Sequence, residues 1–178
     1  MSTNKYQPHL LILPEDDAYR DMANGFVKHF AIILRKIQIE KPARGWLDLL
    51  ECFSKEYVQG VRTYPERHIL LLLDLDGQSE RGSRLFDKIP IDIKDRVFFL
   101  CGLNEAEDIK RELGSGHFEV IGERLAQSCY DVAHANSNSP WLCQQLQYNK
   151  DELVRLATVV RPFIFVLPRP TTTFFIHK

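Results

Sequence analysis

The sequence predicts an α/β fold, an open and mainly parallel sheet with helices on both faces. Apolar segments of strand length occur at 9–14, 68–76 and 95–103, and strands this apolar are typical of parallel sheets covered on both sides. Stretches with apolar residues at helical spacing separate these segments. The alternation of strand and helix along the chain predicts that the strands run parallel, with the helices as crossovers.

The first half of the chain supplies two strand–helix units. "HLLILP" at 9–14 is expected to be a buried strand that runs into three acidic residues. The stretch 18–37 carries apolar residues at helical spacing and is expected to be one amphipathic helix. "IQIEK" at 37–41 predicts a short second strand, because Pro42 and Gly45 interrupt it. A second amphipathic helix is expected at 45–61.

The second half continues the same alternation. The expected elements are a strand at 68–76, a short helix that Pro90 stops, a strand at 95–103, helices at 104–114 and 117–133, and one or two closing helices at 141–165. Residues 135–140 are expected to be a loop, and the tail from Val166 shows no clear period.

The size and composition predict a single α/β domain over 1–178. The formal net charge of -1 gives no overall attraction to nucleic acid or to an anionic membrane. The cysteines form no CxxC pair, and no histidine cluster has zinc spacing. The apolar run near the N-terminus is too short for a signal peptide or a membrane span. We therefore expect a reduced, cytoplasmic protein with no membrane contact.

Acidic residues follow two of the expected strands. Asp74 and Asp76 come at the end of the strand at 68–76, and Glu15 to Asp17 follow the strand at 9–14. Right-handed crossovers would bring the carboxyl ends of these two strands to the same edge of the sheet. We therefore expect the two groups of acids to meet. The alternative is that the strand simply ends in a polar turn at Gly77.

Carboxylates that converge in this way repel one another, so one of them must take up a proton or the group must bind a cation. Mg²⁺ suits such a site because it is held by one or two carboxylates together with water and phosphate oxygens, and Mn²⁺ is a substitute. A carboxylate that does not bind the metal is available as a general acid or base. Asp16 and Glu80 are candidates for a supporting role around the metal, although Glu80 is also consistent with a solvated loop residue.

The order of these motifs resembles the Toprim domain of primases, topoisomerases and nucleases of the overcoming-lysogenization-defect type. "LLILPEDD" before a helix and "ILLLLDLDG" two units later are similar to the Toprim acidic motifs. The resemblance covers about 9–112 and leaves 113–178 as a helical C-terminal extension and tail. It implies that Glu15 is the catalytic general acid/base and that Asp74 and Asp76 are the metal ligands. Gln78 stands where topoisomerases often carry a third aspartate.

Two other families place acids similarly. In a receiver-like interpretation, Asp16 and Asp17 would be the acidic pair and Asp74 the phosphoacceptor, but the Ser or Thr and the Lys-Pro that receivers use later in the chain do not follow. "DLDGQ" also resembles the first motif of haloacid-dehalogenase phosphatases, although it lies in the middle of this chain.

The function predicted from the sequence is Mg²⁺-dependent, nuclease-like phosphoryl transfer on nucleic acid phosphodiesters. Because the net charge is close to neutral, such binding is expected to need a protein partner or a homodimer. The alternatives are a receiver-like module and a degenerate module that binds Mg²⁺ or a partner without catalysis.

Overall fold

The fold is built on a four-stranded, all-parallel sheet with the order β2-β1-β3-β4. A computed structural model describes residues 3–78, 80–131 and 139–166. The strands are β1 (His9–Pro14), β2 (Ile37–Ile39), β3 (Arg67–Asp74) and β4 (Val97–Gly102). The sheet and the helices on both of its faces confirm the predicted α/β class.

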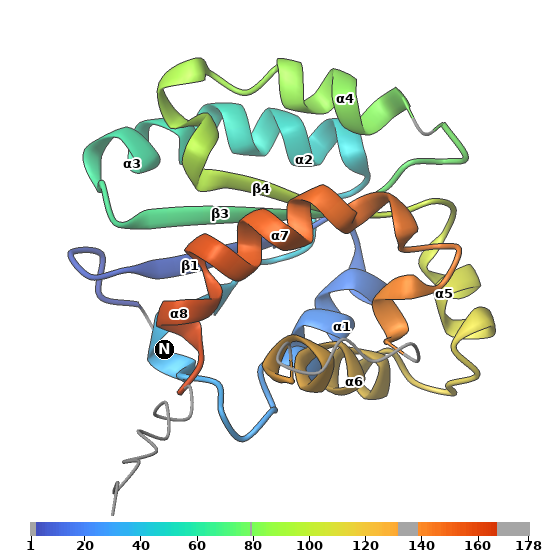
Figure 1. Cartoon of the computed structure of the whole chain (residues 1–178). Coiled ribbons are helices and arrows are strands. Elements are labelled where there is room, and N and C mark those ends of the chain that lie inside the picture. Colours follow the sequence, from blue (N-terminus) through green and yellow to red (C-terminus); the bar gives the residue numbers. More distant parts are fainter. Residues whose placement is uncertain (1–2, 79, 132–138, 167–178) are drawn as a thin grey trace, which may run out of the picture.

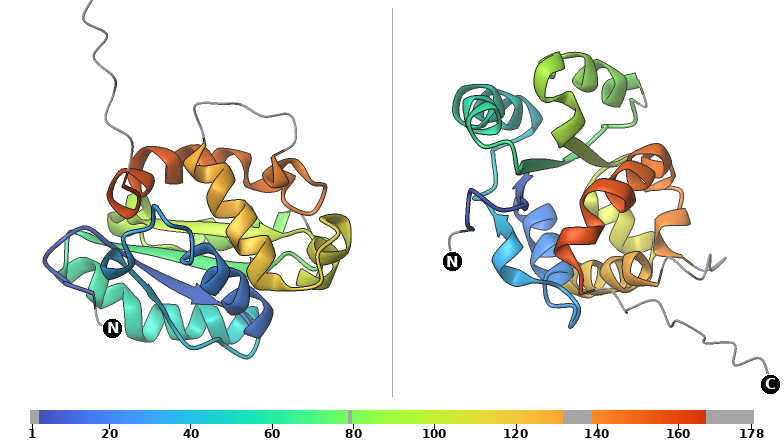
Figure 2. Two further views of the ribbon diagram at one scale, coloured as in Figure 1. Left: turned by 90° about the horizontal axis from the view of Figure 1, so that it is seen from below. Right: turned by 60° about the vertical axis from the view of Figure 1, so that its left-hand side comes forward.

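Helices cover the two faces of the sheet separately (Figure 1). One face carries α2 (Trp46–Cys52), the π-helical turn η2 (Phe53–Tyr57), α3 (Val58–Thr63), α4 (Glu80–Asp87) and the 3₁₀ segment η3 (Ile91–Arg96). The other carries α1 (Asp17–Phe26), α5 (Ala106–Glu112), α6 (Phe118–Tyr130), α7 (Lys150–Val159) and α8 (Arg161–Ile164). Short 3₁₀ segments are η1 (Leu34–Lys36), η4 (Pro140–Leu142) and η5 (Gln147–Asn149). Figure 2 shows the sheet between the two groups.

The strands divide their side chains between two separate cores. Leu70 and Leu72 of β3 join the core under α1, α6 and α8, whereas Ile69 and Leu71 join the core under α2 and α3. This follows from the period of two in a strand, which turns successive side chains to opposite faces. The central strands are consequently apolar throughout, as the sequence indicates.

The helix expected at 18–37 is shorter than predicted, because α1 ends at Phe26. Beyond it, Ile32 forms an isolated antiparallel bridge with Phe165, and the Ile33 N–H donates to the Ile164 carbonyl at 2.8 Å. Phe30 is 78% exposed although the pattern places it on the buried face. Pairing with the C-terminal segment therefore replaces helical hydrogen bonds in this stretch.

The closing segment forms two helices, α7 and α8. Pro162 lies in the first turn of α8, where proline is tolerated, and does not end a helix as expected. The predicted loop lies mostly, and the predicted tail almost entirely, in the segments 132–138 and 167–178, outside the described residues. None of the helices in the described ranges has the length and apolar character needed to cross a membrane.

Candidate acidic site at the ends of β1 and β3

The candidate site lies where the neighbouring strands β1 and β3 end. Their parallel register places Pro14 opposite Leu72, and the next residue, Glu15, donates its N–H to the Leu72 carbonyl at 2.8 Å. The Glu15 side chain then accepts a hydrogen bond at Oε2 from the Asp74 N–H, also at 2.8 Å. The structure thus brings Glu15 and Asp74 together. Between β1 and β3 the strand order reverses direction, which is where open α/β sheets bind ligands.

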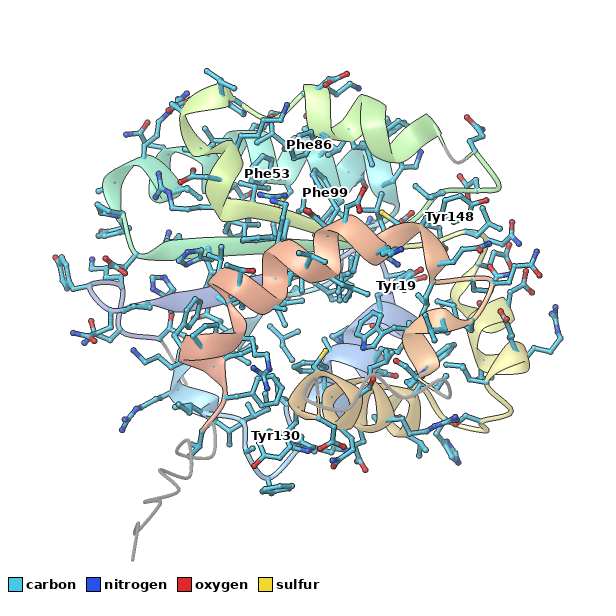
Figure 3. The ribbon with its side chains drawn as sticks, viewed as in Figure 1. Tyr19, Phe53, Phe86, Phe99, Tyr130 and Tyr148 are labelled. Atoms are coloured by element: carbon cyan, nitrogen blue, oxygen red, sulfur yellow. The ribbon has the colours of Figure 1, made fainter. Side chains whose placement is uncertain are left out.

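The Asp74 side chain is buried, with 8% of its surface exposed. Its Oδ1 atom accepts a hydrogen bond of 2.5 Å from the Tyr19 hydroxyl. That hydroxyl accepts a bond from the Gly102 N–H at 3.1 Å, so it links β3 to β4. Tyr19 is labelled in Figure 3. A buried carboxyl therefore has a dedicated hydrogen-bond donor, as burial of such a group requires.

Asp16 positions Tyr19 by capping α1. Its Oδ1 atom accepts a hydrogen bond from the Tyr19 N–H at 2.9 Å, which satisfies one of the free amides at the start of the helix. Asp17 is exposed and pairs with Arg20 at 2.9 Å. Asp16 thus supports the site indirectly, through the helix that carries Tyr19.

Burial makes both meeting carboxyls weaker acids than usual. The pKa of Asp74 is raised to about 7, chiefly by loss of solvation. The Tyr19 hydrogen bond opposes this shift, and the charges of Glu15, Asp16 and Asp76 add to it. Burial likewise raises the pKa of Glu15, although the N–H of Asp74 opposes this shift. Near neutral pH Asp74 can therefore hold a proton or release one.

Asp76 occupies the exposed turn that follows β3. Its φ angle of 48° lies in the left-handed region, as does the φ of 69° at Gly77. The Gly77 N–H donates to the Leu103 carbonyl at 2.7 Å, which ties the turn to the end of β4. The sequence also allowed a simple polar turn at Gly77, and the structure has such a turn, which includes Asp76. Its charge nevertheless acts on Asp74, so the two predicted ligands share one electrostatic environment.

The chemistry of the cluster fits a hard cation only as a site with few protein ligands. Among the residues that the structure describes, no group of three His, Cys, Asp or Glu side chains could hold a metal ion. Mg²⁺ needs only one or two carboxylates when water completes its coordination shell. Asp74 and Asp76 are two carboxylates and so meet that lower requirement. The charge of Asp76 also raises the pKa of Asp74, and a cation would relieve this repulsion. Glu80 begins α4, and its side chain lies outside the described part.

Sequence reasoning missed the partners of Asp74. Tyr19 lies on the apolar face of α1, where packing of its ring is enough to explain a tyrosine. No sequence pattern indicates that its hydroxyl binds a carboxylate. Gly102 ends β4 opposite Asp74, and a β-carbon there would overlap the Tyr19 hydroxyl and lie 2.9 Å from Asp74 Oδ1. The only available signal was the rule that a buried carboxyl needs a donor.

Comparison with known proteins adds no assignment. The sequence matches no protein-family model, and no curated protein is significantly similar to it.

Replacing Gly102 with alanine should break the Tyr19–Asp74 contact. The added methyl group needs the space of the tyrosine hydroxyl, so we expect a loss of about 1–3 kcal/mol in the free energy of unfolding, measured by urea denaturation. Gly116→Ala is the matched control, because no atom lies within 4 Å of its added β-carbon. Equal stability of the two variants would contradict the described packing.

The raised pKa of Asp74 predicts a pH-dependent stability. In the unfolded chain Asp74 titrates near 3.8, and in the folded protein near 7, so the folded state binds the proton more tightly between these values. Its contribution to stability is full below pH 3.8, declines as pH rises, and is lost above about pH 7. The difference amounts to at most about 4 kcal/mol.

Asp74→Asn should remove this decline, because the amide does not ionise. Thermal melting from pH 4 to pH 8 should show the stability of the variant rising relative to the wild type as pH increases. Asp17→Asn, at an exposed acid on α1, should leave the wild-type pH profile unchanged. A parallel pH profile for Asp74→Asn would show that Asp74 ionises normally.

Proposed function

We propose that the acidic site binds Mg²⁺ and supports phosphoryl transfer on nucleic acid phosphodiesters, most simply nuclease-like cleavage. One observation carries the proposal. Glu15 and the buried Asp74 come together at the point of the sheet where strand order reverses, and Asp76 and Asp16 act on the same carboxyl. The resemblance of the strand-end motifs to Toprim domains supports the same assignment.

In this proposal Asp74 and Asp76 hold the metal, and Glu15 handles the proton. A bound ion would supply positive charge that stabilises negative charge on the phosphate oxygens. Glu15 takes a proton from the attacking water, whose oxygen forms the new bond to phosphorus. The bond between phosphorus and the departing sugar oxygen breaks, and that oxygen receives the proton from Glu15. The raised pKa of Glu15 suits a group that both accepts and returns a proton.

The near-neutral charge bears on the partners of this reaction. A net charge of -1 provides little attraction for a polyanion. In the proposal, a protein partner or a second copy of the chain therefore contributes the basic surface that holds the nucleic acid.

A receiver-like module is the second candidate, and the strand order favours it. The order β2-β1-β3-β4 is shared with doubly wound sheets of the flavodoxin and receiver type, in which the site also lies between the first and third strands. This likeness concerns the fold alone. In that case Asp74 would accept a phosphoryl group, and treatment with acetyl phosphate would label Asp74 stably.

Metal binding is the first test of the proposal. We expect Mg²⁺ or Mn²⁺ to bind the wild type in calorimetry and to raise its melting temperature, because an ion that binds only the folded state stabilises it. The double variant Asp74→Asn/Asp76→Asn should lose both effects, and Asp17→Asn should keep them. A wild type that binds neither ion would contradict the proposal and leave the partner-binding module as the better candidate.

Cleavage is the second part of the test. Single- and double-stranded DNA and RNA should be cut by the wild type only with the metal present. Glu15→Gln should lower kcat by about 10²–10⁴-fold while metal binding persists, as expected for loss of a general acid/base. Cleavage that survives unchanged in Glu15→Gln would show that another group handles the proton.

A further inference from the structure

A large apolar cavity lies on the face of the sheet that α1, α6 and α7 cover, beside the acidic site. Its volume is about 670 Å³. Leu70 and Leu72 of β3 form part of its wall on the sheet, and Leu153 and Leu156 of α7 line it from the opposite side. Figures 1 and 2 show α7 crossing this face of the sheet, with α1 and α6 on the same side.

Beside the cavity, α7 leaves its apolar side chains partly exposed. No residue of α7 is buried, and Leu153, Leu156 and Ala157 remain partly exposed although they line the cavity. On the opposite face, Leu49 of α2 and Val61 of α3 are almost completely buried. Protein interiors contain few voids larger than a water molecule. A space of this size lies instead within the range of small-molecule sites.

Among the residues described as lining the cavity, Arg161 is the one charged residue. Its Nε atom donates to the Cys129 carbonyl at 2.8 Å, and a terminal nitrogen donates to the Tyr130 carbonyl at 2.9 Å. Within the described ranges, no carboxylate forms an ion pair with Arg161. An arginine has five N–H donors and is suited to a carboxylate, so its bonds to described residues leave donors that could meet an anionic group.

The rest of the wall is suited to a hydrocarbon chain. The remaining lining residues are uncharged and mostly aliphatic or aromatic. Cys129 also lines the cavity, and burial raises the pKa of its thiol to about 11, in keeping with surroundings of low polarity. A ligand that matches this wall is apolar over most of its length and anionic at one end.

We propose that this cavity binds a long-chain fatty acid, with the acyl chain between α7 and the sheet and the carboxylate at Arg161. The site is separate from the proposed metal chemistry, and the inference holds whether or not the acids are catalytic. Two properties of the cavity indicate this ligand. Burial of methylene groups against the aliphatic wall is favourable, and the carboxylate would pair with Arg161, which has no ion pair among the described residues.

The test compares palmitic acid with hexadecanol, which has the same chain and no charge. Calorimetry on the full-length protein, below the concentration at which either ligand aggregates, should show palmitic acid binding one to one and hexadecanol binding at least tenfold more weakly. Trp141 lines the cavity, whereas Trp46 packs on the other face of the sheet. Palmitic acid should therefore change the fluorescence of Trp46→Phe protein, in which Trp141 is the remaining tryptophan.

Two variants separate the contributions of shape and charge. Ala157→Phe places a ring in the cavity and should weaken both ligands at least tenfold. Val159→Phe is the matched control, because Val159 lies on the same helix but outside the cavity wall. Arg161→Met should bind the acid and the alcohol equally. If that variant does not fold, the comparison of the two ligands on the wild type still decides the role of charge.

Three results would overturn the proposal. If neither ligand binds the wild type, the chain itself fills the space. If Ala157→Phe binds palmitic acid as tightly as Val159→Phe does, the ligand sits elsewhere. If hexadecanol binds the wild type as well as palmitic acid does, Arg161 recognises no carboxylate. None of these readings depends on metal binding or cleavage, so failure here is distinguishable from failure of the proposed function.

Discussion

Burial of one carboxyl, that of Asp74, is the constraint on which the architecture of the site depends. A carboxyl with 8% exposure needs a hydrogen-bond donor, and Tyr19 supplies it. The tyrosine reaches Asp74 because Asp16 caps α1 at the correct place and because Gly102 leaves room for the hydroxyl. The start of α1, the end of β3 and the end of β4 therefore all meet at the hydroxyl oxygen of Tyr19.

The same burial gives the site its chemical character. A carboxyl at a strand end would normally be ionised and solvated, whereas Asp74 is held close to Glu15 with its pKa raised to about 7. Keeping it charged above that pH costs stability, and a bound cation would offset the cost. An asparagine at this position could accept the Tyr19 hydrogen bond without ionising, so it would avoid the loss of stability above pH 7.

The sequence predicted the sheet and the meeting of the acids more reliably than it predicted the contacts inside the site. Apolar strands such as 68–76 are recognisable because burial on both faces removes polar residues, and handed crossovers then place Glu15 near Asp74. The helix at 18–37 was predicted too long, because Ile32 and Ile33 pair with the C-terminal segment, a contact that no local pattern reveals. The role of the Tyr19 hydroxyl was missed because a tyrosine on an apolar face requires only its ring.

Tyr19 also connects the two regions for which functions are proposed. Its ring lines the apolar cavity, and its hydroxyl bonds to Asp74. A ligand packed against the ring would exclude water from that side of the tyrosine. Exclusion of water would strengthen the hydrogen bond to Asp74, which favours the ionised carboxyl, and would also remove solvation from that carboxyl, which favours the protonated form. Binding of the proposed ligand would therefore be linked to the protonation of Asp74 through one side chain, and the linkage would be reciprocal. A ligand in the cavity could affect the acidic site because Tyr19 lines the cavity and also bonds to Asp74.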